Sequence, residues 1–214
     1  MYRQMARTRF LPEKSVRTLR WVAHRNVDLA TGVQFSDILS CNDPNQPDIN
    51  GSTTNLDSAM GWAQLKTWYQ QHQVIGAKIT VQEVAVSTST SVPMYIWIDK
   101  EAVLMPQQYF TGVDEMLSKR KGMKPKIVGT NSNQHASSDH LRGPMREFFS
   151  ANKDGTLSDW ASPLAAGVPE HPMYWHVSMR GTLDTTNPGS ITLKYIIDYI
   201  IESRNPIMFA QSDV

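Results

Sequence analysis

The sequence has little of what disulfide-stabilised and membrane-spanning proteins need. Its 214 residues include one cysteine, Cys41, which excludes an intramolecular disulfide framework and is typical of a reducing compartment. No apolar run approaches the roughly 18 residues of a membrane-spanning helix. The N-terminal stretch MYRQMARTRF also lacks the apolar segment of a secretory signal. We therefore expect a globular chain without membrane insertion.

Motifs for catalysis are missing as well. The sequence has no phosphate-cradling glycine loop, no Gly-x-Ser-x-Gly elbow and no Cys-x-x-Cys pair. Cys41 lies in a polar, Asp- and Pro-rich segment with no activating base, which favours an inert thiol. The spacing of His135 and His140 matches no common metal site, and turn chemistry accounts for Asp154 and Asp159. We expect no catalytic residues, no metal, no cofactor and no enzymatic activity.

Positive charge is concentrated at the N-terminus. Residues 1–25 contain seven basic residues and one acidic residue, Glu13, whereas the remaining chain contains 14 basic and 19 acidic residues. This asymmetry predicts a basic arm over residues 1–15 and a single domain over 16–214. A polyanion-binding arm and a solvated terminus explain the charge equally well at this point. The candidate phosphate-binding residues are Arg3, Arg7, Arg9, Lys14, Arg17 and Arg20.

The stretch ITLKYIIDYIIESRNP, residues 191–206, fits two kinds of secondary structure. Its odd positions from Ile191 to Ile201 are all apolar or aromatic, and six of the twelve residues 191–202 are β-branched, which favours a strand. A helix would also place several of these isoleucines on one face. The turn Asn187-Pro188-Gly189 just before it favours the strand. Because both faces of this strand are partly apolar, we expect it to be central in its sheet.

Alternation of the same kind recurs along the chain. Further strands are expected within residues 16–27, 33–40, 72–86, 92–100, 127–130, 140–150 and 173–181, with a β-bulge at Glu83. One short helix is expected after residues 54–57, which resemble a capping box, with Trp62, Leu65 and Tyr69 on its apolar side. This order predicts an all-β, eight-stranded antiparallel jelly-roll sandwich with one or two short helices in its loops.

A second basic stretch, KRKGMKPK, spans residues 119–126. Its cations suit a nuclear-import signal, an acidic-glycan patch or a plain solvated loop. They are Lys119, Arg120, Lys121, Lys124 and Lys126. In the strand at residues 92–100, Tyr95 and Trp97 suit either a sugar platform, as in jelly-roll lectins, or an interface between subunits.

Three segments resemble the capsid proteins of small circular single-stranded-DNA viruses, the circovirus-like group. They are WAQLKTWYQQHQVIGAKITVQ (62–82), KGMKPKIVG (121–129) and the final strand with its Asn205-Pro206 end. The family's arm is usually longer and denser in arginine than the one seen here.

The resemblance implies a structural protein that assembles with about sixty copies of itself around a single-stranded DNA genome. It implies a location in the virion, with the host nucleus or cytoplasm as the place of assembly, and a glycan receptor or the nuclear-import machinery as possible host partners. The long segments 41–55, 100–122 and 151–172 are expected at interfaces and on the outer surface. A jelly-roll carbohydrate-binding module is the alternative, and a cupin-like enzyme is a weaker one, because only His176 is placed inside an inner strand.

Overall fold

The computed structural model describes residues 11–29, 34–49, 58–86, 92–99, 124–128, 169, 172–180 and 189–207. Within them lie seven strands and one helix. The strands are β1 (Lys14–Leu29), β2 (Gln34–Ser40), β3 (Tyr69–Val86), β4 (Val92–Asp99), β5 (Lys124–Val128), β6 (Tyr174–Arg180) and β7 (Gly189–Pro206), and the helix is α1 (Trp62–Trp68). The predicted eighth strand, residues 140–150, lies outside the described residues.

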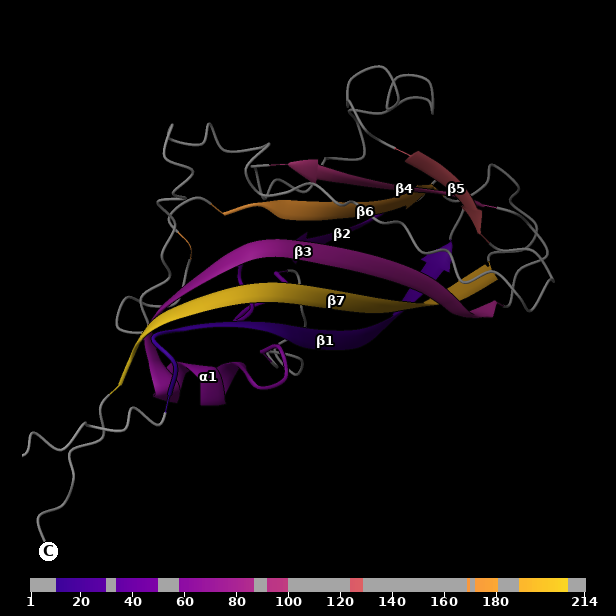
Figure 1. The fold of residues 1–214 in the computed structure, drawn as a ribbon. Helices are drawn as coiled ribbons and strands as arrows, with labels where there is room; N and C mark the ends of the chain where they lie inside the picture. The colour runs from indigo at the N-terminus through magenta and orange to yellow at the C-terminus, as the bar shows by residue number, and fades with distance from the viewer. Residues whose placement is uncertain are drawn as a thin grey trace, which may run out of the picture.

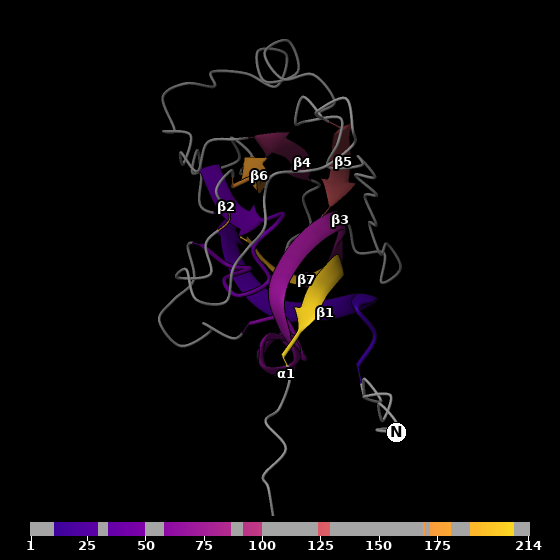
Figure 2. The same cartoon turned by 60° about the vertical axis from the view of Figure 1, so that its left-hand side comes forward.

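The strands form two antiparallel sheets that lie one above the other (Figures 1 and 2). One sheet has the order β1-β7-β3 and the other has the order β2-β6-β4-β5. Consecutive strands β1 to β4 alternate between the sheets, and β6 and β7 do so again. Such crossovers between two antiparallel layers are the topology of a jelly roll.

The central position predicted for the last strand is confirmed. β7 pairs along its length with β1 on one side and with β3 on the other. Its odd residues from Ile191 to Ile201 are all buried and point into the sandwich, whereas Ile200 on the outer face is 41% exposed. The predicted bulge is confirmed too, because the β3–β7 register shifts between Glu83 and Ala85.

The core lies between the two sheets. Its largest fully buried side chains include Trp175 from β6, Tyr195 and Tyr199 from β7, and Ile79 from β3. The hydroxyl of Tyr199 donates a 2.7 Å hydrogen bond across the sandwich to the Ser40 carbonyl oxygen. β6 departs from the expected alternation, since His176 and Ser178 are buried as well.

An ion cluster also joins the sheets. Arg25 on β1 lies 3.3 Å from Asp37 on β2 and 2.6 Å from Asp48 in the segment that follows. Burial raises the pKa of Asp37, and the nearby Arg25 guanidinium partly offsets that effect. Because a buried carboxylate without a partner is strongly destabilising, this cluster fixes how β1 sits against β2.

The segment after β2 corrects a prediction. Residues 41–55 were expected at interfaces and on the outer surface, yet in their described part, residues 41–49, Cys41, Asn42, Asp43 and Asp48 are buried within the subunit itself. The side chains satisfy the backbone there, since the Asp43 carboxylate accepts from the Asn45 and Gln46 N–H groups. Burial raises the pKa of the Cys41 thiol well above its ordinary value, so this thiol is protonated and unreactive.

The helix also begins later than the capping-box motif predicts. α1 starts at Trp62, and its N-cap is Gly61 in the left-handed conformation with no side-chain cap. Residues 54–57 lie outside the described part. Trp62 and Leu65 are buried as expected, but Tyr69 is the first residue of β3. The Met60 N–H donates to the Arg20 carbonyl oxygen at 2.9 Å, which holds the helix entrance against the outer edge of β1.

Candidate nucleic-acid interface

Half of the predicted phosphate-binding residues lie on a regular strand. Lys14, Arg17 and Arg20 belong to β1, which begins at Lys14, whereas residues 1–10 with the three other arginines lie outside the described residues. Side chains alternate across a strand, so Lys14 and Arg20 share the outer face of the β1-β7-β3 sheet. Arg17 points to the opposite side.

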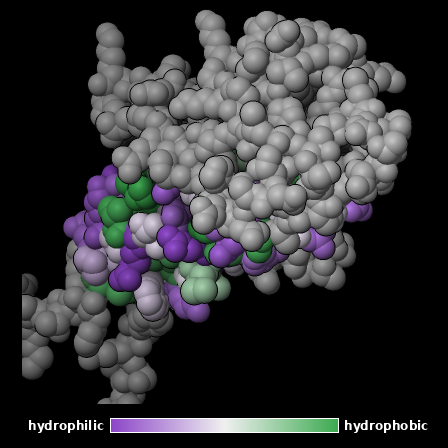
Figure 3. All heavy atoms as spheres, turned by 90° about the vertical axis from the view of Figure 1, so that its right-hand side faces the viewer, coloured by the Kyte–Doolittle hydropathy of each residue, from purple (hydrophilic) through white to green (hydrophobic). Residues whose placement is uncertain are grey.

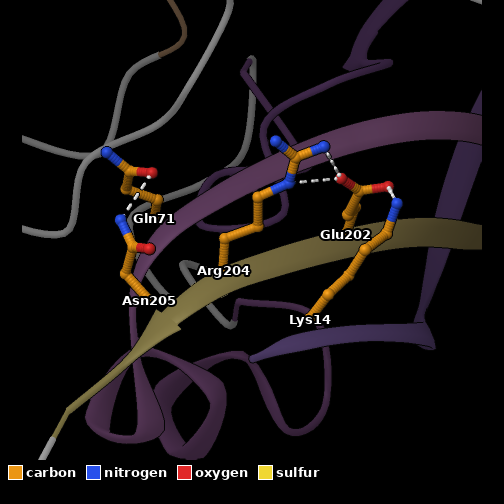
Figure 4. Close-up of polar contacts among 5 residues, drawn as sticks. All are labelled: Lys14, Gln71, Glu202, Arg204 and Asn205. Carbon is orange, nitrogen blue, oxygen red and sulfur yellow. Dashed lines mark hydrogen bonds and ion pairs between the residues drawn. The ribbon is translucent and has the colours of Figure 1, made fainter. Parts of the chain in front are cut away.

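Lys14 is part of an ion cluster at the end of this sheet (Figure 4). Its Nζ lies 2.6 Å from Glu202 Oε2, and a terminal nitrogen of the Arg204 guanidinium lies 2.6 Å from Glu202 Oε1. Burial of Glu202 opposes its ionisation, but hydrogen bonds from Lys14 and Arg204 outweigh burial and lower its pKa. The cluster therefore carries two cations on one ionised carboxylate, a net positive charge.

Arg20 has a partner of the same kind. Its guanidinium donates two hydrogen bonds to Asp198, at 2.6 and 3.1 Å. The hydrogen bond to Asp198, together with its negative charge, raises the pKa of Arg20. The Arg20 side chain is 63% exposed, and an exposed pair of this kind adds little stability. A phosphate can therefore compete with Asp198 for Arg20 at little energetic cost.

Arg17 lies beside the helix. Its guanidinium carbon stands 5.7 Å from the centre of the Trp68 ring, and its Nε donates to the Ser15 hydroxyl at 3.3 Å. Lys66 on the same helix lies 5.7 Å from the Trp62 ring. Cations from β1, β7 and α1 thus gather at the end of the sheet where β1 begins.

The chain leaves the sandwich at this end in both directions. Lys14 pairs with Arg204 in the β1–β7 register, so the start of β1 lies beside the end of β7. Asn205 adopts a left-handed φ of 56°, a conformation that asparagine tolerates better than most residues. Its side-chain amide donates to Gln71 Oε1 at 3.0 Å (Figure 4). The chain therefore enters β1 next to the Lys14–Glu202–Arg204 cluster.

Sequence reasoning missed the two acids. Asp198 and Glu202 are read from the sequence as the polar positions of a strand, and their partners on β1, Arg20 and Lys14, are more than 170 residues away along the chain. Only the strand register brings them together. The available signal was the i, i+4 spacing of Asp198 and Glu202, which places both on one face of β7.

The other residues predicted from the sequence lie either outside the described residues or on the sheet β2-β6-β4-β5. Lys119, Arg120 and Lys121 lie outside the described residues, as do His135, His140, Asp154 and Asp159. Lys124 and Lys126 belong to β5, the edge strand of its sheet. Tyr95 and Trp97 belong to β4, but their side chains are outside the described part, so the sugar-platform hypothesis is not tested.

The described residues contain no group of three or more His, Cys, Asp or Glu side chains placed to hold a metal ion. No helix within the same residues is both long and apolar enough to cross a membrane.

Comparison with known proteins gives similarity in structure alone. No family model matches the chain, and no curated protein matches it either. A chain of the tobacco necrosis virus structure is similar at 14% identity, covering 91% of this chain and 97% of that one, with a TM-score of 0.50. The capsid protein in a 60-mer of BFDV aligns at 10% identity over 94% of this chain and all of that one, with a TM-score of 0.49. The chain has the jelly-roll fold of viral capsid proteins.

Proposed function

We propose that this protein is the subunit of a small icosahedral capsid that encloses a single-stranded DNA genome. The observation that carries the proposal is the strand order, β1-β7-β3 facing β2-β6-β4-β5, in a fold shared with the tobacco necrosis virus chain. The DNA genome follows from the circovirus-like resemblance of residues 62–82, 121–129 and 191–206. The protein would act in the virion, with assembly in the host nucleus or cytoplasm, and would have no catalytic role.

Self-assembly follows from the same fold. A closed shell of about sixty identical subunits needs heterologous contacts that close into rings. Size-exclusion chromatography of the purified full chain separates this proposal from a carbohydrate-binding module, because a capsid subunit elutes as a particle and a lectin as a small oligomer.

Genome binding is assigned to the basic arm and the cluster beside it. Arg3, Arg7 and Arg9 precede β1 in the sequence, and β1 begins at Lys14 of the Lys14–Glu202–Arg204 cluster. Arginine suits this role because its planar fork binds phosphate through two hydrogen bonds. Each phosphate contact contributes a salt slope of about −0.7 for single strands. The three arm arginines alone thus predict a slope of about −2, and all six cations predict about −4.

The ion pairs indicate which of these cations contribute most to phosphate binding. Lys14 and Arg20 are already paired with Glu202 and Asp198, so a phosphate must displace or share a carboxylate. The arm arginines should therefore account for most of the measured slope.

A charge-matched pair of variants tests this assignment. Arg3→Gln/Arg7→Gln/Arg9→Gln removes three cations from the arm, and Lys119→Gln/Arg120→Gln/Lys121→Gln removes three from the second basic stretch. We expect the arm variant to flatten the salt slope by about 2 and to lower the nucleic acid content of the particles. The control variant should leave both unchanged. Equal effects of the two variants on the salt slope and on the nucleic acid content would show that binding depends on net charge and not on the position of the cations.

The second basic stretch is proposed as a host-facing patch for acidic glycans or nuclear import. Lysine and proline on an edge strand also discourage unwanted strand pairing, which is a sufficient structural reason for Lys124 and Lys126. Retention of particles on heparin separates these roles. The Lys119→Gln/Arg120→Gln/Lys121→Gln variant should elute at lower salt, and unchanged retention would remove the glycan role.

A further inference from the structure

The outer face of the β1-β7-β3 sheet carries a pattern of its own, away from the cluster at its end. The registers of β7 with β1 and β3 align residues in rows that cross all three strands. Three successive rows, each taken in the order β1, β7, β3, are Arg20, Asp198, Lys78; Val22, Ile196, Thr80; and His24, Lys194, Gln82. Figure 3 shows one side of the molecule, where hydrophobic and hydrophilic residues of the described part lie interleaved.

Two lysines in these rows have no carboxylate partner among the described residues. Lys78 stands in register with Asp198, but both Asp198 oxygens accept hydrogen bonds from Arg20. Lys194 is flanked by His24 and Gln82, so its own row holds no acid. Both lysines are half-buried on a face where ion pairing is otherwise the rule.

The row between these two cationic rows is largely aliphatic. Val22 is 45% exposed, and on the same face Ile200 is 41% and Val16 is 52% exposed. Isolated exposed aliphatic residues need no explanation. Here, however, they lie on one face of one sheet, and the Val22–Ile196 row lies between two rows that contain cations, a pattern found at binding surfaces.

We propose that this face binds single-stranded nucleic acid, with Lys78 and Lys194 contacting phosphates and the Val22–Ile196 row packing against sugars and bases. The inference rests on the proposed function and extends it to a second contact surface on the folded domain. Lys194 lies four residues from Asp198, so the two cationic rows are about 13 Å apart along the strand. A flexible strand can place phosphates at both rows and apolar groups between them.

The charge of the face favours a polyanion over a second copy of the same face. Its described outward positions hold five cations, Lys14, Arg20, Lys78, Lys194 and Arg204, and three acids, Asp28, Asp198 and Glu202. Two such faces would repel each other. A sulfated glycan satisfies the cations but has no planar bases to pack against the aliphatic row, so single-stranded nucleic acid fits better.

The test compares three full-length proteins with opposite expected outcomes. Lys78→Gln/Lys194→Gln removes both contacts, Asp198→Asn removes the competing carboxylate, and Arg3→Gln/Arg7→Gln/Arg9→Gln tests the arm. Fluorescence anisotropy with a labelled single-stranded thymidine oligonucleotide is measured on unassembled subunits from about 50 to about 200 mM salt. A heparin oligosaccharide is the second probe, and circular dichroism checks folding.

We expect the lysine variant to flatten the slope by about 1.4 and to lower the affinity roughly 25-fold at about 0.1 M salt. The Asp198→Asn variant should bind the oligonucleotide more tightly, a change that damage to the fold does not produce. An unchanged slope in the lysine variant together with a reduced slope in the arm variant would overturn the sheet-face inference and leave the arm proposal standing. Loss of heparin binding with unchanged oligonucleotide binding would overturn it in favour of a glycan.

Discussion

Acid should weaken the folded subunit through one buried histidine, His72. This residue is 1% exposed, its Nε2 lies 3.1 Å from the Tyr69 carbonyl oxygen, and its Nδ1 lies 2.9 Å from the Ser203 hydroxyl. Because a carbonyl oxygen only accepts hydrogen bonds, Nε2 carries the proton and Nδ1 accepts from Ser203. Both nitrogens are satisfied in the neutral ring, so the fold holds His72 uncharged.

The environment of the ring sets the size of the effect. Burial lowers the pKa of His72 from 6.5 to about 4, and the positive charge of Lys66 adds to the lowering. In the unfolded chain the ring takes up a proton near pH 6.5. Between that pH and about 4 the unfolded state binds more protons, so the free energy of unfolding falls as the pH falls. The full difference between the pKa of His72 in the unfolded and folded states corresponds to about 3 kcal/mol in the free energy of unfolding. This is a large part of a typical domain's stability.

Urea unfolding of the subunit at a series of pH values measures this effect. The urea concentration at the unfolding midpoint should drop between pH 6.5 and 4.5. Glu202 should affect stability only at lower pH, because its pKa is lowered in the folded protein. A His72→Gln variant should be less stable at neutral pH yet lose less between these pH values. An equal loss in the variant, or an NMR titration of His72 near pH 6.5, would refute the reasoning.

Three further outcomes test the packing of the sandwich. Tyr199→Phe removes the buried hydrogen bond to Ser40 and should lower the free energy of unfolding by about 1–2 kcal/mol; a change near zero would contradict that bond. Ile197→Ala in the core should cost about 3 kcal/mol, whereas Ile200→Ala on the outer face should change stability by less than about 1 kcal/mol, as measured by urea unfolding. Cys41 should resist a thiol reagent in the folded subunit and react on unfolding, and rapid labelling of the native protein would contradict its burial.

The sequence predicts the parts of this fold that depend on local pattern. Alternation over residues 191–201, together with the turn at 187–189, predicts a strand, and its two partly apolar faces predict a central one. The bulge at Glu83 follows from the change of phase between Val81 and Val84.

Features that depend on distant partners are not predictable in this way. The acids of β7 become partners of Lys14 and Arg20 only through the β1–β7 register. The segment 41–49 looks like a surface loop because it is polar, but its side chains hydrogen-bond its own backbone. The helix begins at Trp62 because its N-cap, Gly61, adopts a left-handed conformation that redirects the chain there, and the capping-box pattern at 54–57 does not reveal this.

Electron microscopy of the purified full-length protein tests the central claim most directly. We expect closed icosahedral particles of about sixty subunits, with each subunit a jelly roll and nucleic acid density inside the shell. Only monomers or small oligomers, across a range of salt and pH at high protein concentration, would contradict it.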